Sequence, residues 1–363
     1  MSITLRYALQ RGDFGLDVDL KIPVHGITGV FGESGSGKTT LLRCMAGLER
    51  PAIGRLVIGS DVWQDQSKNV MRPVHKREIG YVFQEPRLFR HLNVRRNLDY
   101  GWRRRNGRSD ASGFDHIVTL LGLDRLLHRM PEALSGGEAQ RVAIARALLC
   151  APRVVLMDEP LAALDRARKD EILPFLDRLH AELSLPIIYV SHNIEEMCRL
   201  CDHLVVIENG QILANEDLQS ALVRMDLPIL SGDEAGSVIY ATVKDYDADY
   251  ELTRFGFSGG ELLLPGQFGE VAADARLRIR ASDISLCRDR PEHSTILNIL
   301  PAVVEELQGG RSPSILLRLR IGTDRLIARI TRRSRDELNL QPGDTVLAQI
   351  KAVAVRNTAR GGV

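Results

Sequence analysis

The stretch "GESGSGKT", residues 32–39, decides the fold of the first half of the chain. It follows the apolar run "GITGVF" and precedes "TLLRCMAGL", so it joins an expected buried strand to an expected helix. Its glycines let backbone N–H groups approach phosphate oxygens, while Lys38 reaches the β- and γ-phosphates and the Thr39 hydroxyl ligates Mg²⁺. This P-loop pattern predicts a nucleotide site. The predicted ATP-binding residues are Gly32, Glu33, Ser34, Gly35, Ser36, Gly37, Lys38, Thr39 and Thr40.

Composition bounds the class of protein. A chain of 363 residues exceeds the usual size of one hydrophobic core, so we expect two domains. Its 48 Lys and Arg nearly balance 47 Asp and Glu, which gives no reason to expect a nucleic-acid partner. Apolar runs such as "PRVVLMD" are much shorter than the roughly 20 residues of a spanning helix, and the N-terminal stretch has no signal-peptide core. We therefore expect a cytosolic chain that reaches a membrane only through a partner.

The pattern of hydrophobic residues changes along the chain. Residues 1–230 alternate strand-like apolar runs with helical segments, as in an α/β domain, with a helical insert at about 86–150. The Gly, Ser and acidic residues of "LSGDEAGS" then predict a linker at 231–237. Residues 238–363 alternate with period two between turns, which predicts a small all-β barrel or sandwich.

A second motif, "RVVLMDEP" at residues 153–160, completes the phosphate chemistry. An apolar strand is expected to end at Asp158, which would hold the Mg²⁺ shell together with Thr39. The next residue, Glu159, offers a carboxylate that can polarise an attacking water. These residues predict hydrolysis of the nucleotide as well as its binding.

A third motif, "LSGGEAQ" at residues 134–140, predicts an additional anion site. Ser135 can cap a helix, and the two glycines after it leave the first N–H groups of that helix open. One nucleotide does not need two γ-phosphate sites in one chain, so we expect this motif to serve ATP bound to a second copy. The residues assigned to that contact are Ser135, Gly136, Gly137 and Glu138.

These motifs, followed by a strand that ends in "SHN", together resemble the ATP-binding-cassette (ABC) ATPases over about residues 1–230. The resemblance implies a head-to-tail homodimer that docks on integral-membrane permease subunits. It gives catalytic roles to Gln84, which senses Mg²⁺ and the permease, and to His192, which contacts the γ-phosphate, beside Glu159. It also places Asp165 of "LAALD" against the partner copy. Either Tyr7 or Phe14 is expected to stack on adenine.

The basic stretch "RRNLDYGWRRRNGR", residues 95–108, has three interpretations. It can be a solvated helix face or a permease contact within the helical insert. Tyr100 and Trp102 lie between its charges, which also permits nucleic-acid binding, although we expect no such partner.

The C-terminal segment from about 293 to 356 resembles the small molybdate-binding domain called Mop, an OB-like fold. The resemblance rests on "STILN" (294–298), "ELNLQPGD" (337–344) and the expected final strand "AQIKAVAV" (348–355), although Leu297 stands where an arginine is common. It implies oxyanion binding by Ser294, Thr295, Asn298 and Lys351.

The whole chain then resembles the ATPase subunit of a molybdate importer at the cytoplasmic face of the inner membrane. The resemblance implies ATP and Mg²⁺ as cofactors, a periplasmic oxyanion-binding protein as an indirect partner, and molybdate as a regulatory ligand. The alternative is an importer of another solute, such as sulfate or a sugar, in which the β domain is a regulatory scaffold.

Overall fold

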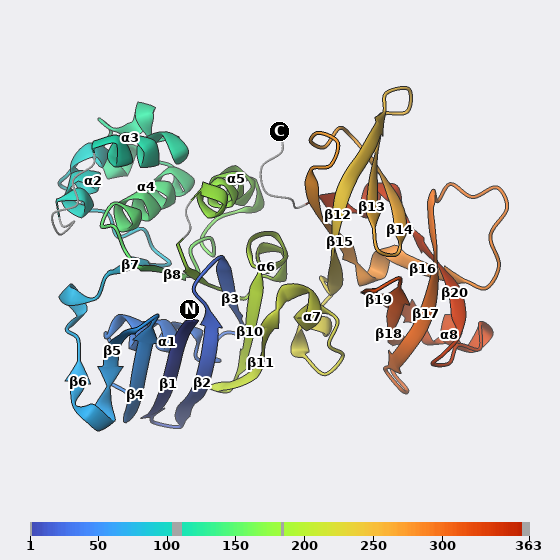
Figure 1. The fold of residues 1–363 in the computed structure, drawn as a ribbon, viewed down its shortest axis with the longest axis horizontal. Coiled ribbons are helices and arrows are strands. Elements are labelled where there is room, and N and C mark those ends of the chain that lie inside the picture. Colours follow the sequence, from blue (N-terminus) through green and yellow to red (C-terminus); the bar gives the residue numbers. More distant parts are fainter. Residues whose placement is uncertain (1, 104–110, 183–184, 358–363) are drawn as a thin grey trace. The chain divides into compact units, whose positions relative to one another are not determined.

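The computed structural model describes residues 2–103, 111–182 and 185–357. The chain forms two compact units, Met1–Glu216 and Asp217–Val363, coloured blue to yellow-green and yellow to red in Figure 1. No helix in the described part of the chain has both the length and the apolar character needed to cross a bilayer.

A six-stranded sheet forms the centre of unit 1. Its strands run in the order β11-β10-β3-β9-β8-β7, and the pairs β10–β3, β3–β9, β9–β8 and β8–β7 are parallel. The bounds are β3 (Ile27–Phe31), β7 (Ile79–Val82), β8 (Val154–Asp158), β9 (Ile187–Ser191), β10 (His203–Glu208) and β11 (Gln211–Asp217). Strands β8 and β9 are buried along their whole length, as expected for strands covered on both faces. Because parallel strands end at the same edge, the segments after β3, β8 and β9 are brought together.

An antiparallel sheet packs beside the parallel one. It has the order β2-β1-β4-β5-β6, with β1 (Ser2–Arg11), β2 (Phe14–Pro23), β4 (Ile53–Ile58), β5 (Asp61–Asp65) and β6 (Val70–Met71). Helix α1 (Lys38–Ala46) places Leu41, Leu42 and Met45 in one core with residues from both sheets. The helix that follows the P-loop is therefore fixed by packing on two sides.

Between β7 and β8 the described residues contain no strand, only helices. They are α2 (Val94–Trp102), α3 (Ala111–Leu120) and α4 (Gly136–Leu148), which gather together in Figure 1. Two more helices of unit 1 follow β8 and β9, namely α5 (Arg166–Glu182) and α6 (Ile194–Leu200). The α/β arrangement matches the fold class predicted from the sequence.

Unit 2 contains two five-stranded antiparallel sheets around a common core. The first has the order β14-β13-β12-β15-β21 and the second β16-β20-β17-β18-β19. Phe255 and Leu277 of the first sheet pack in one cluster with Leu317 and Val346 of the second. The bounds are β12 (Gly236–Asp247), β13 (Leu252–Phe257), β14 (Gly260–Pro265), β15 (Asp274–Arg280), β16 (Ile284–Cys287), β17 (Asn298–Gln308), β18 (Ser314–Ile321), β19 (Asp324–Thr331), β20 (Thr345–Ile350) and β21 (Arg356–Asn357), with helices α7 (Leu218–Leu222) and α8 (Arg332–Glu337).

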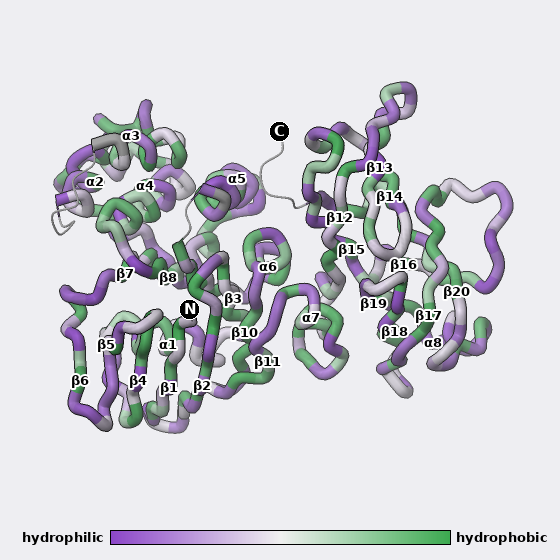
Figure 2. Tube along the Cα trace, in the orientation of Figure 1, coloured by the Kyte–Doolittle hydropathy of each residue, from purple (hydrophilic) through white to green (hydrophobic). Residues whose placement is uncertain are grey.

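The all-β prediction for the second half is confirmed by these sheets. In Figure 2 the hydrophobic residues concentrate along the strands, and the turns between them are mostly hydrophilic. This distribution is the one that period-two alternation produces when one face of each sheet is buried.

The boundary between the units lies at residues 216 and 217, upstream of the linker predicted at 231–237. The apolar residues Val223, Met225 and Leu230 form a small core with Ala281 and Ile327 of unit 2. The Arg329 guanidinium donates to the carbonyl oxygens of Leu230 and Gly232, at 2.8 and 2.7 Å. The predicted linker is thus part of unit 2, because the apolar residues before it need a core that the β domain supplies.

Candidate functional site

The P-loop lies at the carboxyl end of β3 and has a tightly constrained backbone. Gly35 and Gly37 have φ angles of +84° and +108°, which favour glycine. A Cβ at Gly32 would collide with the Ile207 carbonyl oxygen, and one at Gly37 would lie 2.8 Å from the Phe14 ring. The glycines predicted from the motif are therefore required by the local geometry.

Lys38 lies at the floor of this loop. Its side chain is 4% exposed, and its Nζ donates to the carbonyl oxygens of Gly32 and Glu33, at 2.8 and 2.7 Å. The same Nζ lies 3.7 Å from Oε1 of Glu159. Burial lowers the pKa of Lys38, while the nearby carboxylates of Glu159 and Asp158 act in the opposite direction. The ammonium is thus held in the position from which it can meet a phosphate.

Asp158 is the last residue of β8 and connects two other elements. Its Oδ1 accepts a 2.8 Å hydrogen bond from Thr39 Oγ1, and its Oδ2 accepts a 3.0 Å bond from the Tyr81 hydroxyl. Burial beside the carboxylate raises the pKa of Tyr81, so this hydroxyl stays a donor. Thr39 and Asp158, predicted as metal ligands, therefore meet, and their oxygens are the hard donors that Mg²⁺ prefers.

Glu159 and His192 form the second polar pair of the site. Nδ1 of His192 lies 3.1 Å from Oε2 of Glu159, and the Glu159 backbone N–H donates to the Val190 carbonyl at 3.0 Å. Glu159 has a φ of +45°, a left-handed conformation that costs about 1 kcal/mol in a non-glycine residue. The turn after β8 is strained in a way that directs this carboxylate toward Lys38 and His192.

A cavity of about 490 Å³ opens over Lys38, Thr39 and Glu159. Gln84, which is exposed just after β7, lines it as the sequence predicted. Arg11, at the end of β1, also lines it and was not singled out from the sequence. The full lining is Arg11, Phe14, Ser34, Gly35, Gly37, Lys38, Thr39, Thr40, Gln84 and Glu159.

The structure separates the two candidates for adenine stacking. Tyr7 has no exposed surface and lies in the core between the sheets. The prediction that Tyr7 could stack on adenine is therefore wrong. Phe14 lines the cavity beside Gly37. Alternation along β1 explains the burial of Tyr7, because Ile3, Leu5 and Tyr7 all point into the core.

The "LSGGE" residues open helix α4 with a capping box. Ser135 Oγ accepts from the Glu138 N–H at 3.2 Å, and Oε2 of Glu138 accepts from the Ser135 N–H at 2.7 Å. The hydrogen bond from this N–H is the main cause of a lowered pKa at Glu138. The Ser135 hydroxyl still has its own proton to donate, and none of the residues from Ser135 to Glu138 lines the P-loop cavity of its own chain.

Asp165 precedes helix α5. Its Oδ1 accepts from the Arg168 N–H at 2.9 Å, and its side chain is 63% exposed. Like the "LSGGE" residues, it lies outside the lining of the P-loop cavity.

In unit 2 the four predicted oxyanion donors differ in exposure. Ser294, Thr295 and Lys351 are exposed, and Ser294 Oγ accepts from the Ile296 N–H at 3.1 Å. Lys351 follows β20 instead of lying within the final strand, and its neighbour Ile350 pairs with Asn298. Ser294 and Thr295 thus precede β17, and Lys351 follows the residue of β20 that pairs with the first residue of β17.

Asn298 is 3% exposed, and both ends of its amide bind the backbone of Leu263. Its Oδ1 accepts from the Leu263 N–H at 2.8 Å, and its Nδ2 donates to the Leu263 carbonyl at 3.1 Å. Leu263 belongs to β14 and Asn298 to β17, so this amide joins the two sheets. Both polar atoms of the Asn298 amide are therefore already hydrogen-bonded to Leu263 within one chain.

Comparison with known proteins identifies the family. A model described as "ABC transporter" matches residues 16–162, and one described as "TOBE domain" matches residues 294–356, nearly the segment predicted to be Mop-like. The sequence is 50% identical over 354 residues to "Molybdenum import ATP-binding protein ModC 1" of Azotobacter vinelandii, which covers 97% of this chain and 98% of that protein. The chain belongs to the ModC family of ABC transporter ATPases.

Another member of the ModC family, from Albidiferax ferrireducens, is 49% identical over 353 residues, which cover 97% of this chain and 96% of the relative. Among solved structures, cbiO1 of Clostridium perfringens, described as part of the ABC transporter complex cbiONQ, is similar with a TM-score of 0.53. It is 26% identical and covers 61% of this chain and 90% of that chain. The predicted family and fold class are confirmed.

The basic stretch of this ModC-family chain lies partly in α2. Tyr100 packs on Phe89 with ring centroids 4.6 Å apart, and Trp102 packs on Phe114 at 5.7 Å. Both aromatic rings therefore contact other rings of the helical insert, and Tyr100 is 41% exposed. Residues 104–108 of the stretch lie outside the described part of the chain.

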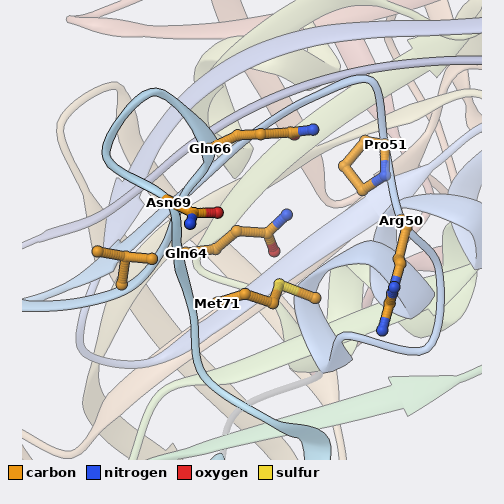
Figure 3. A pocket seen from close by; sticks show the side chains of 7 residues that line it. Arg50, Pro51, Gln64, Gln66, Asn69 and Met71 are labelled. Atoms are coloured by element: carbon orange, nitrogen blue, oxygen red, sulfur yellow. The ribbon is translucent and has the colours of Figure 1, made fainter.

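A second cavity of about 310 Å³ lies in the antiparallel part of unit 1, and Figure 3 shows the side chains around it. It is lined by Arg50, Pro51, Gln64, Gln66, Asn69, Val70 and Met71. It shares no lining residue with the P-loop cavity, and amides and apolar groups dominate it. We assign it no part in the phosphate chemistry.

Proposed function

We propose that this chain is the ATP-hydrolysing subunit of a molybdate importer, acting as a head-to-tail dimer on permease subunits at the cytoplasmic face of the inner membrane. The observation that carries the proposal is that Lys38, Thr39 and Glu159 line one cavity and Asp158 accepts a hydrogen bond from Thr39. The chain is also about half identical to molybdenum import ATP-binding proteins over nearly its full length. A sulfate or sugar importer remains the alternative, and the relatives' names favour molybdate.

The P-loop is proposed to bind the phosphates of ATP. Backbone N–H groups of residues 33–39 would surround the phosphate oxygens, and Lys38 would exchange its carbonyl contacts for charge-assisted bonds to them. Phe14 would stack on adenine at the wall of the cavity. The residues that would hold Mg²⁺ are Thr39, Asp158 and Gln84; when bound, the ion neutralises charge on the β- and γ-phosphates.

Hydrolysis is proposed to depend on Glu159 and His192. The Glu159 carboxylate would accept a hydrogen bond from the attacking water and polarise it. His192, in contact with Glu159, would orient this carboxylate and donate to the γ-phosphate. Ser135, Gly136, Gly137, Glu138 and Asp165 of a second copy would complete the site, which explains why they lie outside the cavity of their own chain.

Unit 2 is proposed to take molybdate as a regulatory ligand, while a periplasmic oxyanion-binding protein delivers it as substrate. Ser294 and Thr295 would supply exposed donors before β17, and Lys351 would supply one after β20, whose last residue pairs with the first residue of β17. Asn298 would contribute by fixing the start of that strand, since its amide is bound to Leu263.

Stimulation of ATP hydrolysis tests the proposal. The full chain, assembled with its permease in nanodiscs, should hydrolyse ATP faster when a molybdate-loaded periplasmic binding protein is added. The same protein loaded with sulfate is the control. Equal rates with both would remove molybdate from the proposal, and no hydrolysis in any arm would remove the ATPase role.

A further inference from the structure

The carboxylate of Glu196, on α6, is buried in unit 1 away from the P-loop cavity. It is 4% exposed. Its Oε2 accepts from the hydroxyls of Tyr189 and Ser191, at 2.8 and 2.9 Å, and its Oε1 accepts from Lys169 Nζ at 2.8 Å. A buried ion pair contributes little to stability compared with apolar residues of similar volume. Fold stability alone therefore gives a weak reason for this cluster.

One end of the cluster holds the loop that carries His192. Ser191 Oγ donates to Glu196 and accepts from the Asn193 N–H at 3.0 Å, so the residues on both sides of His192 are fixed. Asn193 Oδ1 in turn accepts from the N–H of Glu196 at 3.2 Å. The His192 side chain itself is 53% exposed. Its backbone position is therefore set from the Glu196 side.

The other end of the cluster reaches the loop that contains Asp165. Lys169 lies in the first turn of α5, and its backbone N–H donates to the Asp165 carbonyl at 3.0 Å. Its side chain binds Glu196 at the same time. A displacement of Asp165 thus moves a residue that is bonded directly to the His192 side of the site. Figure 1 shows α5 and α6 in the same part of unit 1, and residues of the two helices are in contact.

We propose that the Lys169–Glu196 pair couples the loop at Asp165 to the position of His192. This inference rests on the proposed function, in which Asp165 faces a second copy and His192 serves the ATP of its own chain. Engagement of Asp165 by the second copy would then set the geometry of His192 and Glu159 for hydrolysis. Lys169 and Glu196 are positioning residues, because neither lines the cavity.

The same two helices contain a matched control. Arg199 of α6 donates to Asp177 of α5 through Nε and Nη2, at 3.1 and 3.0 Å, and the Asp177 side chain is 5% exposed. This second α5–α6 ion pair is bonded to neither Asp165 nor the His192 loop in any contact described above. Loss of either pair should affect packing similarly, whereas loss of the Lys169 pair alone should affect turnover.

The experiment measures ATP hydrolysis and binding of a fluorescent ATP analogue by the full chain. We expect Lys169→Met to lower kcat by about tenfold or more, with KM and analogue affinity within about twofold of the unchanged chain. Lys169→Arg should restore most of kcat because it keeps the charge. Arg199→Met should leave kcat unchanged while lowering thermal stability as much as Lys169→Met does.

Equal kcat values for Lys169→Met, Arg199→Met and the unchanged chain would overturn the coupling. If Lys169→Met does not fold, Glu196→Gln carries the test, because its amide oxygen still accepts from Tyr189 and Ser191 while the charge that holds Lys169 is lost. It should lower kcat in the same way, and an unchanged kcat would again overturn the inference. Absence of hydrolysis by the unchanged chain would instead contradict the proposed function.

Discussion

Nδ1 of His192 lies 3.1 Å from Oε2 of Glu159, whose other carboxylate oxygen lies 3.7 Å from the ammonium of Lys38. One carboxylate thus joins the two residues that are proposed to meet the γ-phosphate from different loops. This relationship depends on the parallel sheet, because β3, β8 and β9 deliver their following segments to one edge.

Glu159→Gln should separate binding of ATP from its hydrolysis. The amide keeps the size of the side chain but cannot polarise water as a carboxylate does, so hydrolysis should fall by about 10²–10⁴-fold. The P-loop contacts remain, and the variant should accumulate as an ATP-dependent dimer. Light scattering with saturating ATP measures this directly. A variant that stays monomeric would count against the head-to-tail arrangement.

Lys38→Ala and Gln84→Ala should differ in nucleotide affinity. Removing the buried ammonium takes away charge-assisted bonds to several phosphate oxygens, each about 1.5–3 kcal/mol, so affinity should fall by at least tenfold. Gln84 lines the cavity as an exposed residue, and its loss should leave affinity nearly unchanged while uncoupling hydrolysis from transport. Titration with a fluorescent ATP analogue compares them. Equal affinities would show that the role given to Lys38 is wrong.

Tyr81→Phe should raise the Mg²⁺ concentration needed for half-maximal hydrolysis. The change removes the 3.0 Å hydrogen bond to Asp158 Oδ2, and loss of such a supporting contact typically weakens a metal site by about 10–100-fold. Analogue binding without Mg²⁺ should not change. Tyr240→Phe, at a half-exposed tyrosine of unit 2, is the control. An unaltered Mg²⁺ dependence in Tyr81→Phe would mean that Thr39 alone fixes the carboxylate.

Asn298→Ala should destabilise unit 2. It removes two hydrogen bonds between the sheets and leaves the N–H and carbonyl of Leu263 without these partners, which should cost about 2–3 kcal/mol. Leu297→Ala is the matched control, because the side chain next to Asn298 is 52% exposed and should change stability by less than about 0.5 kcal/mol. Thermal unfolding of the full chain compares the two. Similar stabilities would show that the amide does not join the sheets.

The motifs formed by residues close together in the sequence were predictable, and the contacts between distant segments were not. Lys38, Thr39, Asp158 and Glu159 belong to patterns whose chemistry can be read from neighbouring residues. Tyr81 reaches Asp158 only because β7 pairs in parallel with β8, and that register is not visible in the sequence.

Contacts between distant segments also explain why the roles of Asn298 in unit 2 and of Glu196 in unit 1 were not predicted from the sequence. The amide of Asn298 is used by Leu263, a residue on another sheet, so its role could not be separated from that of the exposed Ser294 and Thr295. Lys169 and Glu196 come from helices α5 and α6, whose contact arises only in the folded unit. Their charges alone are typical of solvated helix faces.

Molybdate uptake into proteoliposomes tests the central claim most directly. The full chain is reconstituted with its permease and periplasmic binding protein. ATP is supplied on the side of the membrane where the full chain lies. Uptake of radioactive molybdate should require ATP and should fall to background with Glu159→Gln, while sulfate should not accumulate. Molybdate uptake that persists with Glu159→Gln, or sulfate uptake in place of molybdate, would contradict the account.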